Sequence, residues 1–390
     1  MIPNLALGIM PSGLVARIDG FAIGLLDLAR VGELPVTKSE HTLLGETHLN
    51  AFLALGPQRH REIYEALYQL RVRNPDRLWS IGQPIEKAPI QLGLAPGDFV
   101  DFYASRHHAA RCARLTGNAD LLPEAWDWMP LAYHGRTAGI VGSNAKINRP
   151  SGWMNGRTGW ALQASRMLDY EMELGFVMRH STEPGEQLTV NDFDDAVFGA
   201  VLVIDWSARD LQGNEAKPLG PFHSKAFATQ VGHWIVPLEV LARCSEPADD
   251  LRPKGRRPAK GNIYDIRFEA MLKSRKGQSA VAGSANLKDM GWTPAEMMAH
   301  LTQSGAPVRS GDLFATGTIS GPGRDETGCL LERFAEGTAP LMVGDEQRHY
   351  LADGDKLSVT AHMQKDGQSI AFDTLHGSIA ASQTHREPSR

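Results

Sequence analysis

The run of residues 198–206 constrains the fold of this chain more than any other segment. It is almost continuously apolar, with a single acid, Asp205, next to its last residue. A short run of this kind is typical of a strand that is buried on both faces. An ionised carboxylate inside such a strand costs free energy unless it is paired, hydrogen-bonded or bound to a metal ion. The sequence therefore predicts a β-rich core that contains an acid, unless Asp205 ends the strand and caps the following turn.

Residues 168–176 predict a second strand, in which apolar and acidic residues alternate. Because alternate residues of a strand share a face, Glu171 and Glu173 lie together, opposite an apolar face. That apolar face consists of Leu168, Tyr170, Met172, Leu174 and Phe176. Two carboxylates on one side repel each other unless water or a cation lies between them. The alternative is an ordinary amphipathic strand, whose polar face is turned to solvent.

Residues 1–90 have the pattern of a separate small module. Two short strands are predicted between residues 14 and 26, and residues 57–72 predict a helix. The stretch 83–97 is rich in proline and glycine, which is typical of a linker. We therefore expect two domains, a small β-rich one over residues 1–90 and a larger one over residues 91–390.

After residue 98 the pattern changes to short apolar runs that are broken by glycine, proline and aspartate. Thr293 and Glu296 form a capping box that opens a short helix ending near Leu301. Residues 309–319 and 356–363 predict late strands. The 39 glycines and 23 prolines of the chain also favour a β-rich fold over a helical bundle. The expected class is mainly β (α+β).

Composition argues against several classes of protein. The formal net charge of −5 is spread along the chain without a dominant basic block, which argues against a nucleic-acid partner. No apolar run is long enough to predict a membrane span, and the first residues lack the basic start of a signal peptide. The three cysteines are far apart and odd in number, which argues against a disulfide framework and a zinc–thiolate site. We expect a cytoplasmic enzyme.

A fourth acid in an unusual setting is Asp101, which lies among the aromatic residues of the segment 98–103. Together with Glu171, Glu173 and Asp205, it would make a site of hard oxygen ligands, which suits Mg²⁺ or Ca²⁺. No local spacing requires the four acids to converge. From the residues alone, a metal site is therefore one interpretation beside the ordinary ones.

Several basic and polar residues are candidates for catalysis. His108 is a candidate general base, and Glu332, an acid at the end of an apolar stretch, is a candidate for orienting it. The alternatives are a surface imidazole and an exposed glutamate on an edge strand. Arg209, Gln212 and Lys225 lie close to glycines and prolines, where irregular backbone often carries site residues, although Arg209 could equally be a surface charge. No G-x-S-x-G or P-loop motif supports a serine hydrolase or a nucleotide-binding protein.

Seven features taken together resemble the fumarylacetoacetase family. They are residues 101–108 (DFYASRHH), 133–136 (YHGR), 171–173 (EME), 205–212 (DWSARDLQ), 218–222 (PLGPF), Lys225 and residues 317–322 (GTISGP). Their order and approximate spacing hold from about residue 95 to residue 380, whereas residues 1–90 match only in forming a small module. The resemblance implies an SH3-like N-terminal barrel followed by a mixed β-sandwich roll of the fumarylacetoacetase type, assembled as a homodimer.

The resemblance also implies roles for particular residues. A divalent cation, Mg²⁺ or Ca²⁺, would be ligated by Asp101, Glu171, Glu173 and Asp205, with Lys225 and Thr229 near it. His108 would be the general base, held by Glu332. Developing negative charge would be stabilised by Lys225, Arg209 and Gln212. The substrate would be contacted by Tyr103, Tyr133, Arg209, Gln212 and Thr318.

The implied activity is hydrolysis of a carbon–carbon bond in a β-diketo acid such as fumarylacetoacetate. Water activated by His108 would attack a carbonyl group, and the departing carbanion is tolerable only as an enolate. One alternative is decarboxylation or tautomerisation of a related β-dicarbonyl compound at the same metal site. Another is a binding protein that uses the same pocket without catalysis.

Two positions depart from the family pattern. Gly117 stands nine residues after His108, where the family has an arginine that helps to bind a substrate carboxylate. Ala216 stands where the family has a tyrosine that contacts the substrate. Losing a charged partner of a carboxylate costs about 2–5 kcal/mol of binding free energy. We therefore expect the same chemistry on a changed substrate, either larger or lacking one carboxylate.

Overall fold

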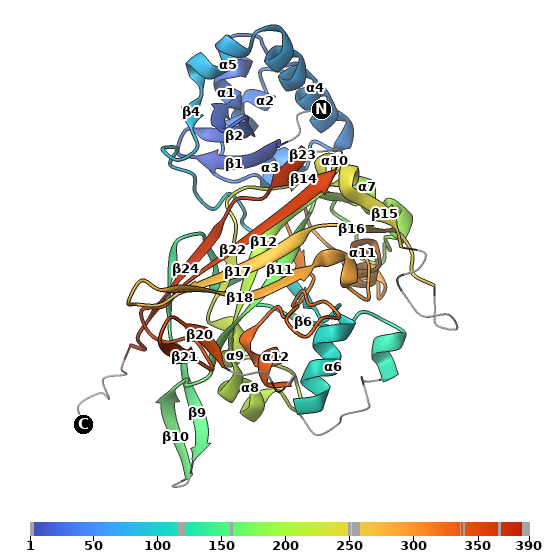
Figure 1. Cartoon of the computed structure of the whole chain (residues 1–390). Coiled ribbons are helices and arrows are strands. Elements are labelled where there is room, and N and C mark those ends of the chain that lie inside the picture. Colours follow the sequence, from blue (N-terminus) through green and yellow to red (C-terminus); the bar gives the residue numbers. More distant parts are fainter. Residues whose placement is uncertain are drawn as a thin grey trace, which may run out of the picture.

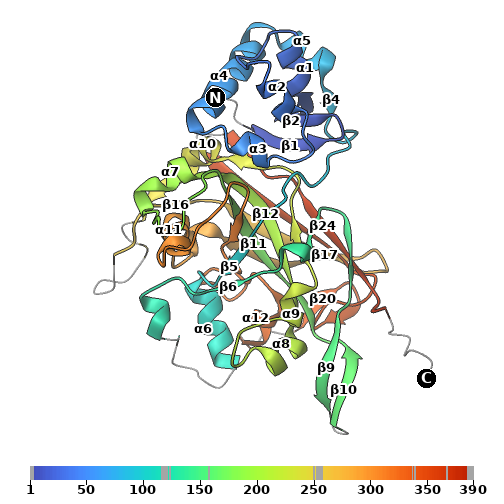
Figure 2. The same cartoon turned by 180° about the vertical axis from the view of Figure 1, so that it is seen from behind.

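The computed structural model describes residues 4–115, 122, 124–156, 159–248, 251, 258–335, 337, 340–365 and 368–383, and it describes their side chains except between residues 364 and 371. The N-terminal residues form a lobe at one end of the long β-sheets that make up most of the rest (Figure 1). Several helices gather at the opposite end, where a two-stranded hairpin projects (Figure 2). The mixed α+β architecture, dominated by sheets, confirms the predicted class at this level.

Four short strands and five helices make up the N-terminal lobe. The strands form one sheet in the order β1 (Ala6–Met10), β2 (Gly13–Ile18), β3 (Phe21–Gly24) and β4 (Gln83–Pro84). The helices are α1 (Leu25–Arg30), α2 (Glu40–Leu44), α3 (Asn50–Leu53), α4 (Pro57–Arg73) and α5 (Pro75–Ile81). The two predicted strands and the predicted helix α4 are confirmed, although the second strand ends at Gly24 because α1 begins there. Closure of this sheet into an SH3-like barrel and a domain boundary near residue 90 stay predictions.

His60 of α4 lies where the lobe packs on the large sheets. It is fully buried between Phe52 and Phe198, whose ring centroids lie 4.8 Å and 5.0 Å from its own. Its Nε2 lies 2.8 Å from the carbonyl oxygen of Phe52. Burial lowers the pKa of His60 to about 4, because the charged imidazole would lose its hydration there.

This histidine is expected to make stability depend on pH. In the unfolded chain it takes up a proton near pH 6.5, whereas in the folded protein it stays neutral down to about pH 4. Its contribution is therefore complete above pH 6.5 and is lost as the pH falls toward 4. Between pH 7 and pH 5, the free energy of unfolding should fall by about 2 kcal/mol more in the native protein than in a His60→Gln variant. Urea unfolding at both pH values measures this difference, and an identical pH dependence of the two proteins would assign the effect to other groups.

The central sheet contains the longest strands of the described chain. Its order is β6 (Ala132–His134), β5 (Phe99–Phe102), β19 (Leu313–Ala315), β11 (Leu168–Met178), β12 (Val197–Ala208), β13 (Thr229–Val231) and β7 (Ile140–Gly142), and β14 (Val236–Pro237) pairs with β12. Every residue of β11 and β12 is buried, which confirms both predicted strands. The predicted strand 309–319 is wrong in its length, because Gly311 and Gly317 take positive φ angles of 92° and 74° and interrupt the extended backbone on either side of β19.

A second sheet packs against the first. Its order is β18 (Ser279–Asn286), β17 (Arg267–Lys273), β22 (Lys356–Lys365), β24 (Leu375–Ala380) and β8 (Ala145–Asn148), and β23 (Gln368–Ala371) pairs with β22. The strand β22 confirms the prediction for residues 356–363. The two sheets approach closely at Gly377 of β24, where an added Cβ would lie 2.4 Å from the ring of Trp206 of β12. A glycine is therefore needed where the two layers meet.

The helices that matter for the site lie together at the end remote from the N-terminal lobe (Figure 1). They are α6 (Arg106–Leu115), α8 (Arg209–Glu215), α9 (His223–Ala226) and α12 (Leu330–Ala335), beside the hairpin of β9 (Ser151–Gly156) and β10 (Gly159–Ala164). The remaining α-helices and strands are α7 (Phe193–Ala196), α10 (Leu238–Leu241), α11 (Pro294–Thr302), β15 (Ser245–Pro247), β16 (Asn262–Tyr264), β20 (Leu341–Val343) and β21 (Glu346–Arg348). The capping box of Thr293 and Glu296 opens α11 as predicted. Among the described helices, none combines the length and the apolar character that crossing a membrane requires.

Candidate active site

The register of the central sheet brings three predicted site residues to one face. Glu171 of β11 pairs with Asp205 of β12, and Asp205 pairs with Thr229 of β13. Side chains of directly opposed residues point to the same side of a sheet. Glu173 lies two residues along β11 and therefore shares that side.

Asp101 reaches the same face from a strand that is remote in sequence. It lies on β5, which runs parallel to β19 and pairs Asp101 with Ala315. Ala315 pairs in turn with Gly175, which is the next residue after Glu173 on this face of β11. On its other side, Asp101 pairs with Tyr133 of β6. The four acids therefore converge through strand pairing that no local pattern in the sequence encodes.

All four acids are buried. Their exposed fractions are 1% for Asp101, 6% for Glu171 and 0% for Glu173 and Asp205. One carboxylate oxygen of each lies within 4.8 Å of the others. The burial excludes both ordinary interpretations, a strand face turned to solvent and an aspartate that caps a turn. Carboxylates at this spacing repel one another strongly in a water-poor interior unless positive charge lies among them.

Two cationic side chains supply part of that charge. Lys225 Nζ lies 2.7 Å from Glu171 Oε2 and 2.6 Å from Asp205 Oδ2, and Arg209 Nη1 lies 2.6 Å from Glu171 Oε1. Burial opposes ionisation of Glu171, but Lys225 and Arg209 outweigh it and hold the pKa of Glu171 well below its usual range. Despite its own burial, Lys225 has a raised pKa because Asp205 and Glu171 stabilise its charge. Arg209 is therefore not a surface charge.

The oxygens of Glu173 and Asp101 identify where further positive charge fits. Both oxygens of Glu173 lack a hydrogen-bond partner in the described part of the chain, and so does Oδ1 of Asp101. Burial, together with the neighbouring acids, raises the pKa of both residues well above its usual value. Two cationic side chains do not balance the four carboxylates, and Arg209 is also shared with a fifth buried acid, Asp169. The cluster therefore fits one divalent cation of the kind that prefers oxygen ligands.

His108 and Glu332 face each other beside these acids. His108 lies on α6 and Glu332 on α12, both are buried, and His108 Nδ1 lies 3.2 Å from Glu332 Oε1. Glu332 Oε2 accepts hydrogen bonds from Ser320 Oγ at 2.9 Å and from the Gly328 amide at 2.7 Å. Despite its burial, Glu332 keeps a pKa below its usual value, because His108 and Arg111 stabilise its charge. The surface imidazole and the exposed edge-strand glutamate are both excluded.

The second nitrogen of His108 faces away from Glu332. Thr318 Oγ1 lies 3.3 Å and Cys112 Sγ 3.6 Å from Nε2. Burial alone would lower the pKa of His108, but Cys112 and Glu332 outweigh it and raise that pKa. Since Glu332 engages Nδ1, Nε2 is the atom through which the imidazole can exchange a proton with a bound molecule.

A cavity of about 650 Å³ opens over these groups. The predicted residues that line it are Asp101, Tyr103, His108, Tyr133, Glu171, Arg209, Gln212, Lys225 and Thr318. The others lie behind this surface: Glu173 and Asp205 in the acid cluster, Glu332 behind His108, and Thr229, whose hydroxyl donates to Asp205 Oδ1 at 3.3 Å. Ala216 also lines the cavity, whereas Gly117 lies outside the described residues. The structure therefore gathers every predicted candidate residue at one place.

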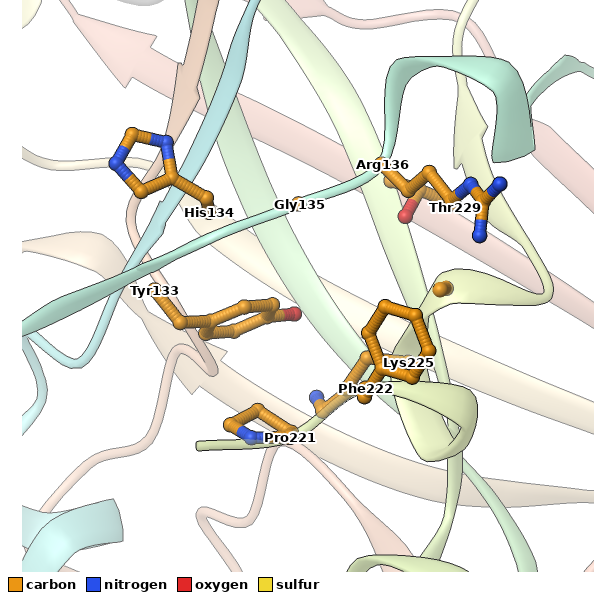
Figure 3. Close-up of a pocket in the computed structure, with 9 residues that line it drawn as sticks. Tyr133, His134, Gly135, Arg136, Pro221, Phe222, Lys225 and Thr229 are labelled. Carbon is orange, nitrogen blue, oxygen red and sulfur yellow. The ribbon is translucent and has the colours of Figure 1, made fainter. Parts of the chain in front are cut away.

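A second cavity of about 260 Å³ lies next to the first (Figure 3). The two cavities share Tyr133, Pro221 and Lys225, and the second one also contacts Arg136 and Thr229. The Tyr133 hydroxyl donates to Asp101 Oδ2 at 2.9 Å and to Asp205 Oδ2 at 2.6 Å. Tyr133 therefore ties together two acids from remote strands at the point where the cavities meet.

Two supporting residues were missed in the sequence. Asp169 is fully buried and accepts hydrogen bonds from the amides of Leu330 and Leu331 and from Arg209 Nε, at 2.9, 3.0 and 3.0 Å. It thereby joins Arg209 to the start of α12, the helix of Glu332. Its position two residues before Glu171 on the same strand was the signal for it.

Arg111 is the other missed residue. Its Nη1 lies 3.4 Å from Glu332 Oε1, and its guanidinium also donates to the carbonyl groups of Gly323 and Glu326. Arg111 follows His108 by one turn of α6, so helical spacing is the signal that could have revealed it. It contacts Oε1 of Glu332, the same oxygen that faces the imidazole.

The buried acids of the central sheet and the histidine–glutamate pair meet at one cavity, which is the arrangement of an enzyme active site. A family model described as fumarylacetoacetate (FAA) hydrolase C-terminal matches residues 78–372. The chain belongs to the fumarylacetoacetate hydrolase family.

The similarity to curated relatives extends over nearly the whole chain. Fumarylacetoacetase of Arabidopsis thaliana is 35% identical over 404 residues, which cover 98% of this chain and 96% of the plant protein. Fumarylacetoacetase of Homo sapiens is 34% identical over 386 residues, which cover 92% of this chain and 91% of the human protein.

Solved structures share the fold at lower identity. A fumarylacetoacetate hydrolase from psychrophilic Exiguobacterium antarcticum aligns with a TM-score of 0.57 at 15% identity, covering 97% of this chain and 99% of that one. A 2-hydroxyhepta-2,4-diene-1,7-dioate isomerase from Mycobacterium marinum aligns with a TM-score of 0.50 at 15% identity, covering 97% of this chain and 100% of that one. At these identities the likeness establishes the fold alone.

Proposed function

We propose that this chain is a hydrolase that cleaves a carbon–carbon bond in a β-diketo acid, with fumarylacetoacetate or a close relative as its substrate. The observation that carries the proposal is the meeting of four buried carboxylates and the pair of His108 and Glu332 at one cavity. Sequence identities of 35% and 34% with the plant and human fumarylacetoacetases, in alignments that cover 98% and 92% of the chain, support it.

In this proposal, His108 activates the attacking water. Glu332 Oε1 lies 3.2 Å from Nδ1 and would favour the neutral tautomer with its proton on Nδ1, which leaves Nε2 to take a proton from water in the cavity. The Thr318 hydroxyl, 3.3 Å from Nε2, would keep water or the substrate carbonyl at the imidazole. Because Arg111, Ser320 and the Gly328 amide also hold Glu332, the imidazole has one orientation.

The four acids would hold a divalent cation that, when bound, polarises a substrate carbonyl as a Lewis acid. They are Asp101, Glu171, Glu173 and Asp205. Ligands that are all oxygens fit either Mg²⁺ or Ca²⁺, so the proposal includes both.

The leaving group sets the second requirement. Cleavage of a carbon–carbon bond expels a carbanion, which is tolerable only when a neighbouring carbonyl delocalises it as an enolate. Lys225, Arg209 and Gln212 line the cavity and would stabilise that negative charge. Tyr103 and Tyr133 would hold the substrate in the reactive orientation.

We also propose a setting for this activity. The protein would act as a homodimer in the cytoplasm on a small β-dicarbonyl acid, without a nucleic-acid or membrane partner. Residues 1–90 would be an SH3-like domain, and residues 91–390 the catalytic domain. The concentration of site residues on elements from β5 onward supports this division.

Turnover of fumarylacetoacetate tests the proposal directly. NMR should show fumarate and acetoacetate appearing in equal amounts, because hydrolysis produces one of each. Excess EDTA should abolish the reaction, and Mg²⁺ or Ca²⁺ should restore it. Formation of carbon dioxide or of an isomer, without these two acids, would instead support decarboxylation or tautomerisation.

A further inference from the structure

One cationic side chain at the large cavity is not engaged by a protein carboxylate. Arg209 and Lys225 contact Glu171, and His108 faces Glu332. Lys217 also lines the cavity and is exposed, yet it makes no hydrogen bond or ion pair within the part of the chain that the structure describes.

Lys217 lies at the outer end of a helical face that enters the cavity. The lining residues Arg209, Gln212, Gly213 and Ala216 recur at helical spacing along α8. Ala216 still has helical backbone angles, φ −61° and ψ −25°, and Lys217 follows it directly. With a rise of 1.5 Å per residue, the end of α8 at Glu215 lies about 9 Å along the helix axis from Arg209, and Lys217 follows two residues later. The cavity thus has a charged group far from the acid cluster.

The rest of the lining is largely apolar. It includes Leu115, Leu131, Met167, Pro221 and Leu331. A ligand that fills the cavity is therefore polar where it meets the acid cluster, apolar along its body, and anionic where it reaches Lys217.

The chemistry fixes which half of the substrate extends toward Lys217. Negative charge develops on the half that leaves as an enolate, so this half must stay beside Lys225, Arg209 and Gln212. The acyl half, whose carbonyl is attacked by the water that His108 activates, then points away from them. Its far end is the part of the substrate that can reach the outer end of α8.

We propose that Lys217 is a specificity-determining residue that binds a carboxylate at the end of the acyl half. The inference rests on the proposed hydrolysis and names its substrate class, a β-diketo acid whose acyl chain is itself a carboxylic acid. It also gives the substrate carboxylate a cation in a chain whose sequence has Gly117 at the position of the family arginine. Ala216 leaves room beside Lys217 because its side chain is only a methyl group.

Two substrates that differ only in this carboxylate test the proposal. One is fumarylacetoacetate, and the other is its analogue with the fumaryl carboxylate converted to a primary amide. For a Lys217→Met variant, KM for fumarylacetoacetate should rise about tenfold, as expected when a charged hydrogen bond is lost. KM for the amide, or its inhibition constant if its turnover is slow, should not change. A Lys217→Arg variant should recover most of the affinity.

The matched control is Lys146→Met, because Lys146 is an exposed lysine on β8 that does not line the cavity. It should leave both KM values as in the native protein. An equal rise for the acid and the amide, or no rise for the acid, overturns the role of Lys217. Failure of the native protein to cleave either substrate overturns the proposed hydrolysis itself, which is a distinguishable result.

Discussion

Replacing His108 by glutamine is expected to lower kcat for carbon–carbon hydrolysis by about 10²–10⁴-fold, the usual range when a positioned general base is removed. Glu332 keeps Ser320, the Gly328 amide and Arg111 as hydrogen-bond partners, so the buried carboxylate stays satisfied and the fold is retained. Glutamine has no nitrogen that takes a proton near neutral pH. The loss should therefore fall on kcat, with little change in the affinity for a divalent cation.

His107→Gln is the matched control for this experiment. His107 precedes His108 on α6, is half-buried and does not line the cavity. Steady-state kinetics of both variants should separate the two histidines, and the cation-induced rise in the melting temperature should be the same in both. Nearly native kcat in His108→Gln would show that another group activates the water.

The two long strands of the core were predictable from sequence because their signals are local. An apolar run predicts β12, and the alternation in residues 168–176 predicts β11 and places Glu171 beside Glu173. The same alternation includes Asp169, which was overlooked because its role depends on Arg209 and on the start of α12. The local sequence pattern therefore predicted the strands, but not the role of every side chain on them.

Convergence of the acids could not be predicted from local pattern. Asp101 joins the others only because β5 pairs in parallel with β19, a strand of three residues whose flanking glycines made its length unpredictable. Likewise, Glu332 meets His108 through the packing of α12 against α6, and no pattern in either helix predicts that the two helices are in contact. The family resemblance predicted that these residues lie together. The register of the sheet explains the meeting of the acids, and helix packing explains the meeting of His108 and Glu332.

Glu173→Gln is expected to change the response of the protein to a divalent cation in a way that tests the acid cluster itself. Glu173 is fully buried, and neither of its oxygens has a hydrogen-bond partner in the described chain. Without a cation, burial of this carboxyl group without a hydrogen-bond partner costs folding free energy, whether the group is ionised or protonated. An amide carries no charge and can donate to the neighbouring carboxylates, so in EDTA the variant should be at least as stable as the native protein.

With a cation present, the order should reverse. A ligand at about 100 times its Kd stabilises the native state by about 2.7 kcal/mol, which for a chain of this size raises the melting temperature by about 3 °C. The variant lacks one of four anionic ligands, so it should bind more weakly and gain much less. Glu269→Gln, at an exposed position of β17, should respond to the cation as the native protein does. Thermal unfolding of all three proteins in EDTA, in Mg²⁺ and in Ca²⁺ measures these differences. If neither cation changes the melting temperature of the native protein, the four buried carboxylates do not form a site for a divalent cation.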